Sequence, residues 1–194
     1  QGTRYDLPIY YLGELMSTNQ ELVLNNDLLP MGEHDGYQHL WQEGHTELKG
    51  SNFKMTWLNQ RNFYSVTSIA EEGDQVILTR IGANDPSFNL RRDPGLIHRR
   101  KSGNTLFASL YEMHGEYSYS TEIPINSFSS IKELQVLQRS EKYIAIQFEL
   151  QSGERYQFAF SLADDSEESQ HTLKTQDGGV LSWTGVYDFK KTED

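Results

Sequence analysis

The densest group of positive charge in this sequence lies in "NDPSFNLRRDPGLIHRRK", residues 84–101. The chain as a whole is acidic, with a formal net charge of -11 from 28 Asp and Glu against 17 Lys and Arg. Guanidinium and ammonium groups bind carboxylates and phosphates. Their concentration in one segment therefore predicts an anion-binding site on an otherwise acidic protein. The candidate ligand-binding residues of this stretch are Arg91, Arg92, His98, Arg99, Arg100 and Lys101.

The same stretch has a structural interpretation. Two Asp-Pro steps, which begin at Asp85 and Asp93, favour an extended or turn conformation before each proline. Arg91 or Arg92 could then pair with one of these carboxylates and hold the loop rather than a ligand.

Strand alternation also divides the basic residues. In an extended segment His98 and Arg100 point to one face, and Arg99 and Lys101 to the other. A single flat cationic face is therefore not required by this sequence, and the two interpretations stay open.

A second candidate surface is the tyrosine-rich stretch "SLYEMHGEYSYS", residues 109–120. Tyr111, Tyr117 and Tyr119 could pack on the flat faces of sugar rings. Together with His114, a tyrosine could also serve as acid or base in a proton abstraction. We favour a hairpin whose rings pack across neighbouring strands, because aromatic cross-strand pairs stabilise sheets. Such a hairpin could still present a sugar-stacking surface.

Three histidines, His34, His39 and His45, lie within residues 34–45. A zinc site would combine them with Asp35 or Glu43. Their spacings of five and six residues match no strong ligand pattern, so a polar loop that leads into a strand is the simpler interpretation. We therefore expect neither a metal nor a cofactor.

Composition excludes several classes of protein. There is no cysteine, which rules out disulfides and a cysteine nucleophile. No apolar run approaches the roughly 20 residues of a membrane-spanning helix. The acidic balance also argues against a general nucleic-acid binder.

The elements that must position these residues are strands. Residues 143–150 and 155–162 alternate strictly between apolar and polar side chains around the turn "QSGE", which predicts a hairpin. Only Glu14–Leu24 is ambiguous for a helix. Short strands at regular spacing predict an all-β fold, an antiparallel β-sandwich or stacked antiparallel sheets, in a single domain spanning residues 1–194. The remaining predicted strands are Phe53–Leu58, Phe63–Ala70, Val76–Ile81, Leu96–Arg100, Thr105–Met113, Tyr117–Ile123, Ile131–Gln138 and Val180–Phe189.

Longer motifs resemble a known family. The sequence is similar to the C-terminal β domain of heparinase II/III-like polysaccharide lyases, closest to the oligoalginate lyases of polysaccharide lyase family 17. The similarity runs in one order from about Arg4 to the C-terminus. The motifs that carry it are "RYDLPIYYLGELMSTN", "HDGYQHLWQEG", "MTWLNQRNFYSVTS", "RIGANDPSFNLRRDPGLIHR" and "SLYEMHGEY".

The resemblance implies a larger parent enzyme. Such lyases pair an N-terminal (α/α) toroid with a C-terminal β domain, and they cleave uronate polysaccharides by β-elimination. The family's catalytic Tyr, His and Asn lie in the toroid and its metal site in an earlier β segment, and neither maps onto this chain. The resemblance also implies a periplasmic or secreted location and, as partners, an acidic polysaccharide such as alginate and the toroid, without nucleic acid or membrane.

We therefore expect a non-catalytic accessory module that binds uronate polysaccharide through Arg and Lys contacts to carboxylates and aromatic contacts to sugars. The alternative is a structural domain that packs on the toroid and has no ligand of its own. A third possibility is that the chain is one piece of an undivided lyase.

Overall fold

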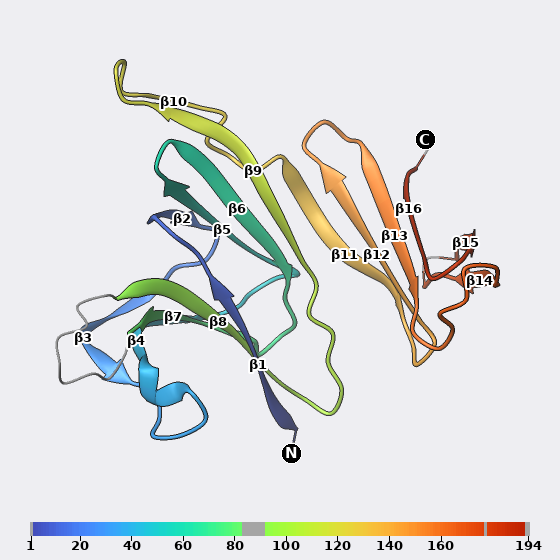
Figure 1. The fold of residues 1–194 in the computed structure, drawn as a ribbon, viewed down its shortest axis with the longest axis horizontal. Coiled ribbons are helices and arrows are strands. Elements are labelled where there is room, and N and C mark those ends of the chain that lie inside the picture. Colours follow the sequence, from blue (N-terminus) through green and yellow to red (C-terminus); the bar gives the residue numbers. More distant parts are fainter. Residues whose placement is uncertain (1, 83–91, 177, 193–194) are drawn as a thin grey trace. The chain divides into compact units, whose positions relative to one another are not determined.

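A computed structural model describes residues 2–82, 92–176 and 178–192 (Figure 1). The predicted all-β, antiparallel fold is confirmed, because the described chain consists of strands, turns and one short 3₁₀ turn, η1 (Tyr37–His39). The chain divides into two compact units, residues 1–129 and residues 130–194, which are described separately. The expectation of one domain spanning residues 1–194 stays a prediction.

The first unit is a sandwich of two five-stranded antiparallel sheets. Sheet A has the strand order β1-β8-β7-β4-β3, and sheet B has the order β10-β9-β6-β5-β2 (Figure 1). The strands are β1 (Thr3–Tyr10), β2 (Glu14–Thr18), β3 (Val23–Pro30), β4 (Leu40–Glu47), β5 (Asn52–Asn59), β6 (Asn62–Ile69), β7 (Gln75–Ile81), β8 (Asp93–Ser102), β9 (Ser109–Ser118) and β10 (Ile123–Ile125).

Alternation along the strands builds the core between these sheets. In β5, Phe53, Met55 and Trp57 point inward and are buried. They meet Val66 of β6 and, from sheet A, apolar residues of β1, β7 and β8. Each fully buried side chain of this size contributes about 2–3 kcal/mol through the hydrophobic effect.

The second unit combines a four-stranded sheet with a hairpin. Sheet C has the order β11-β12-β13-β16, and the hairpin joins β14 to β15. Ala145, Ala159 and Leu137 of sheet C share a core with Leu181 and Trp183 of the hairpin. The strands are β11 (Ile131–Arg139), β12 (Tyr143–Leu150), β13 (Arg155–Ser161), β14 (Gln170–Lys174), β15 (Val180–Thr184) and β16 (Tyr187–Lys191).

One buried ionic cluster ties the two sheets of the first unit together. Asp74 ends the turn between β6 and β7, and its side chain is 1% exposed. It accepts hydrogen bonds from Arg100 Nε at 2.8 Å and Arg100 Nη2 at 2.6 Å, and one from His98 Nε2 at 2.7 Å. Arg100 also donates to the backbone carbonyl of Leu106 at 2.8 Å, in the segment that leads into β9.

The cluster is electrostatically matched. Burial by itself raises the pKa of Asp74, but the hydrogen bonds from Arg100 and His98 outweigh that effect and hold the pKa far below its ordinary value. Glu71 lies beside the pair, and its carboxylate also accepts a hydrogen bond from Arg100 at 2.8 Å. Since both charges of the Asp74–Arg100 pair lie out of water, each one depends on the other.

We expect Arg100→Met to destabilise the chain by about 3–5 kcal/mol, because it leaves Asp74 buried without its main counter-charge. The matched control is Lys101→Met, which removes the neighbouring, exposed cation of the same strand and should change stability by less than about 0.5 kcal/mol. Urea unfolding followed by tryptophan fluorescence measures both. Equal unfolding midpoints for the two variants would show that the cluster does not hold the sandwich together.

Candidate functional site

Strand β8 divides the predicted basic residues as alternation requires. His98 and Arg100 point inward, are 1% and 2% exposed, and belong to the Asp74 cluster. Arg99 and Lys101 point to the outer face of sheet A, and Arg92 is exposed just before the strand. Arg91 and the first Asp-Pro step lie outside the described residues. A ligand contact by any of these residues stays a prediction.

The three predicted tyrosines do not form one cluster. Tyr111 is paired with Val66 across β9 and β6, so it lies on the inner face of sheet B. Tyr117 pairs with Pro124 on the opposite face, where its ring meets that of Tyr119 edge-on at 5.2 Å. The hydroxyl of Tyr119 donates to the backbone carbonyl of Gln60 at 2.6 Å. The expected hairpin with a turn at residues 114–116 is absent, because β9 runs through these residues. The ring contact between Tyr117 and Tyr119 joins residues two apart in the chain and does not cross between strands.

A cationic group forms where β1 lies beside β8. Arg4 is directly opposite Lys101, and Asp6 is directly opposite Arg99. All four side chains point to the outer face of sheet A, because Leu7 and Ile9 of β1 point into the core. We call Arg4, Arg99 and Lys101 the basic strip. Arg4 was missed from the sequence, since β1 was not predicted; the alternation in "RYDLPIY" is the signal that could have identified the strand.

Asp6 organises the basic strip. Arg99 binds it in a bidentate manner, with Nε and Nη2 each 2.8 Å from a carboxylate oxygen. The hydroxyl of Tyr37 donates to the same carboxylate, and the guanidinium of Arg4 lies 3.7 Å away from it. The Arg4 guanidinium also lies over the Tyr37 ring, 5.3 Å from its centre. One carboxylate therefore orients two guanidinium groups and one phenol.

These contacts also shift the pKa values. Burial alone raises the pKa of Asp6, but hydrogen bonds from Arg99 and Tyr37 more than offset it, so the pKa is lowered. Burial raises the pKa of Tyr37, and its bond to Asp6 raises it further. The hydrogen bond to Asp6 raises the pKa of Arg99. At neutral pH the carboxyl is ionised, the phenol keeps its proton and the guanidinium keeps its charge.

The basic strip carries an excess of positive charge. Arg4 and Arg99 share the one carboxylate of Asp6, and among the described residues no carboxylate lies within ion-pair distance of Lys101. Like charges directly opposite each other in an antiparallel pair are unfavourable. The exposed ammonium of Lys101 and the half-exposed guanidinium of Arg4 can therefore be stabilised by an anion from solution.

A pocket of about 370 Å³ adjoins the strip, and we call it the outer pocket. Its floor is the outer face of sheet A, and its wall is the loop that contains η1. The carboxylate of Asp35 and the imidazole of His39 lie at its rim, and both side chains are exposed. The lining residues are Asp6, Pro8, Tyr10, Asp35, Gly36, Tyr37, His39, Leu40, Ile81 and Ile97.

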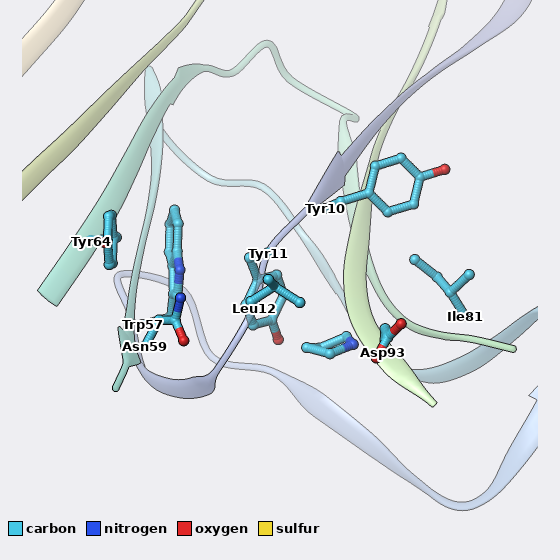
Figure 2. A pocket seen from close by; sticks show the side chains of 9 residues that line it. Tyr10, Tyr11, Leu12, Trp57, Asn59, Tyr64, Ile81 and Asp93 are labelled. Atoms are coloured by element: carbon cyan, nitrogen blue, oxygen red, sulfur yellow. The ribbon is translucent and has the colours of Figure 1, made fainter. Parts of the chain in front are cut away.

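A second pocket of about 430 Å³ continues from the first, and we call it the aromatic pocket (Figure 2). The two pockets adjoin because Tyr10 and Ile81 line both. In Figure 2 the rings of Trp57 and Tyr64 lie side by side; they stack at 5.7 Å with an angle of 16° between their planes. The other lining residues are Tyr11, Leu12, Asn59, Asp93 and Pro94.

The histidine stretch is divided in the structure. His39 lines the outer pocket, whereas Nδ1 of His45 in β4 lies 3.3 Å from the side-chain nitrogen of Gln42. Within residues 2–82, 92–176 and 178–192, no group of three or more His, Cys, Asp or Glu is arranged to hold a metal ion. The described part of the chain also contains no helix long and apolar enough to cross a membrane.

No family model matches the chain. Two curated proteins are similar to it over nearly its whole length. An alginate lyase of Stenotrophomonas maltophilia is 34% identical over 189 residues, which is 96% of this chain. An exo-oligoalginate lyase of Saccharophagus degradans is 30% identical over 190 residues, which is 95% of this chain.

The chain spans about a quarter of the length of each of these two relatives. The resemblance to alginate lyases expected from the motifs is thus confirmed, and the coverage is consistent with a C-terminal domain of a larger lyase. Kinship with heparinase II/III-like enzymes beyond this stays a prediction.

The Asp6 contacts predict a pH-dependent stability. Asp6→Asn should cost about 1–2 kcal/mol at neutral pH, because hydrogen bonds to a charged group are lost. The pKa of Asp6 is lowered in the folded chain, so its contribution is complete above the ordinary value of 3.8 and is lost as pH falls through the folded pKa. The urea midpoints of the Asp6→Asn variant and the unchanged protein should therefore differ by a constant amount above about pH 5. This difference should shrink progressively as the pH falls below about 4.

Asp35→Asn is the matched control for this experiment. It removes an exposed carboxylate from the rim of the same pocket, at a positive φ of 58° that asparagine also tolerates. Its unfolding midpoint should follow that of the unchanged protein at every pH. A gap between the Asp6→Asn variant and the unchanged protein that persists undiminished into acid would contradict the assigned ionisation of Asp6.

Proposed function

We propose that this chain, a homologue of one quarter of two alginate lyases, is an accessory part of such an enzyme that binds alginate on the outer face of sheet A. The observation that carries the proposal is the unbalanced pair Arg4 and Lys101, opposite each other beside a tyrosine-lined pocket. A uronate unit combines a carboxylate with a flat, largely apolar ring face. The basic strip suits the first and the tyrosines suit the second.

The two pockets extend the proposed site beyond a single sugar. A carboxylate bound between Arg4 and Lys101 leaves the neighbouring unit in reach of the outer pocket, where Tyr10 and Tyr37 offer ring faces. Asp35 and Asp93 can accept hydrogen bonds from sugar hydroxyls but would repel a carboxylate. We therefore place the carboxylate-binding end at the basic strip and the hydroxyl-binding end at the aromatic pocket.

The ionisation of the outer pocket supports binding rather than elimination. A base that abstracts the proton beside a uronate carboxylate needs a pKa close to the working pH. Tyr37, the tyrosine nearest the strip, has its pKa raised and gives its hydroxyl hydrogen to Asp6. It is thus poorly suited to take a second proton. In this proposal the isolated chain does not cleave alginate, and absorbance of the unsaturated uronate product should not rise on mixing.

A structural domain without a ligand is the second candidate. Both relatives continue for about three quarters of their length outside the matched region. In this second candidate the rest of a longer chain binds the ligand, and the present chain only supports it. A periplasmic or secreted location, where polymeric alginate would be met, belongs to the same proposal.

Replacing both Arg4 and Lys101 by alanine should weaken binding of alginate oligomers about fivefold to tenfold at low salt, since each exposed charge contact contributes up to about 1 kcal/mol. The loss should shrink at high salt, because salt screens exposed charges. Isothermal titration at two salt concentrations measures both effects. Lys142→Ala, an exposed lysine of the second unit, is the control and should bind normally.

Absence of heat with the unchanged protein at millimolar ligand would exclude binding and leave the structural role. Unchanged affinity of the Arg4 and Lys101 double variant would instead move the binding site elsewhere on the chain.

Tyr10→Ala should weaken the same binding about fivefold, because a sugar-packing ring contributes about 1 kcal/mol. Tyr187→Ala is the matched control, since the two side chains are 65% and 63% exposed and only Tyr10 lines the pockets. Titration at constant salt gives the dissociation constants of the two variants, and the constant of Tyr10→Ala should be about five times that of Tyr187→Ala. Equal losses in both variants would argue against the shared wall of the two pockets as the binding surface.

A further inference from the structure

The inner face of sheet B continues past the core. β9 is paired with β6 so that Tyr111 lies beside Val66 and Met113 beside Tyr64. Val66 is fully buried in the core, and Tyr64 packs against it. Since directly paired residues share a face of the sheet, Tyr111 and Met113 also belong to the inner face.

The same face extends onto β10. Ile125 is paired with Glu116, and Ile123 with Ser118, and these two partners follow Met113 on the inner side of β9 after the irregularity near Phe63. In Figure 1 the β9–β10 hairpin projects from the end of sheet B. We call Tyr111, Met113, Ile123 and Ile125 the β9–β10 apolar face.

Sheet A does not cover this face. The side chains of Tyr111, Met113, Ile123 and Ile125 are 60%, 66%, 55% and 47% exposed, whereas Val66, the partner of Tyr111, is fully buried and Tyr64, the partner of Met113, is partly buried. Leaving several large apolar side chains of one contiguous face in water loses the free energy of their burial. Contiguous apolar surfaces of this kind mark sites of contact with another protein surface.

The face is held rigidly in place. A Cβ atom on Gly115 would lie 2.2 Å from the carbonyl oxygens of both Ile125 and Asn126, so only glycine lets β10 lie this close to β9. Nδ1 of His114 donates to the carbonyl of Asn126 at 2.7 Å, and its Nε2 lies 2.8 Å from the hydroxyl oxygen of Ser65, within hydrogen-bond distance. A fixed, prearranged surface loses little entropy when a partner binds.

We propose that the β9–β10 apolar face is the surface on which the remaining part of a longer lyase chain packs. The occupant is inferred from length: the two relatives contain about three times as much chain again outside the matched region, and that chain needs a surface of contact. This proposal does not depend on alginate binding by the outer face of sheet A, which lies on the other sheet.

Methionine oxidation tests the proposal on the protein as its natural source makes it. Peroxide oxidises exposed methionine to the sulfoxide and spares buried methionine. Met113 should react readily in the 194-residue chain and at least about tenfold more slowly in the intact natural protein, because its thioether is then covered. Two methionines serve as internal references: Met16 is 50% exposed and should react in both, and Met55 is 1% exposed and should resist in both.

Ile123→Lys supplies the second measurement. In the intact protein it should restore Met113 oxidation, because a lysine cannot be buried in an apolar contact without a partner. Val23→Lys is the matched control, at 56% exposure against 55% for Ile123, and should leave Met113 protected. In the 194-residue chain both variants should have the same urea unfolding midpoint as the unchanged chain.

Three results would overturn the proposal. Equal rates of Met113 oxidation in the intact protein and in the 194-residue chain would mean that no additional chain covers the face. The same result is expected if the natural protein consists of these 194 residues alone. Slow oxidation already in the dilute 194-residue chain would mean that the face is covered without more chain. Protection that appears only on raising the concentration of the 194-residue chain would assign the face to a second copy. Alginate titration of the same samples separates these outcomes from failure of the proposed function.

Discussion

The buried pair of Asp74 and Arg100 is the constraint on which the first unit depends. A guanidinium and a carboxylate removed from water tolerate each other only in near-ideal geometry, and here the pair also takes in His98 and the Leu106 carbonyl. Because side chains alternate along a strand, burying the Arg100 side chain fixes which face of the sheet each of the remaining residues of β8 points to. Arg99 and Lys101 must then point outward, where Arg4 and Asp6 of β1 meet them. The internal ionic cluster and the external cationic group are two sides of one strand register.

The concentration of positive charge in the sequence therefore has two physical origins, a buried ionic cluster and an exposed basic strip, which composition alone could not separate. Alternation correctly predicted that His98 and Arg100 share one face and Arg99 and Lys101 the other. It could not tell which face was buried, because a buried arginine depends on a partner, and Asp74 lies 26 residues away in the sequence. Arg4 could not be assigned without β1, because β1 pairs with a strand far away in the sequence: Asp6 and Arg99, for example, are 93 residues apart.

The fold was predictable where alternation was strong and turns were short. The hairpin of β12 and β13 matches the expectation almost residue for residue. Two expected strands, Thr105–Met113 and Tyr117–Ile123, were wrong in their division: one strand, β9, runs through His114 and Gly115, because that glycine serves close packing rather than a turn. The opposite error occurred at Val180–Phe189, where Gly185 adopts a positive φ of 89° and separates β15 from β16. Glu14–Leu24, ambiguous from its sequence, contains β2, a connection over residues 19–22 and the start of β3. Glycine alone does not say which of these roles it has.

The like-charged neighbours Arg4 and Lys101 also bear on how this surface could evolve. Their repulsion is relieved only in part by Asp6, so the free chain gives up some stability to keep both cations opposite each other. Selection for a sturdier domain alone would replace one of them by a neutral or acidic residue. Under the proposed binding of alginate, their joint presence trades stability for recognition at this position, in the way that binding sites commonly oppose the stability of the fold that carries them.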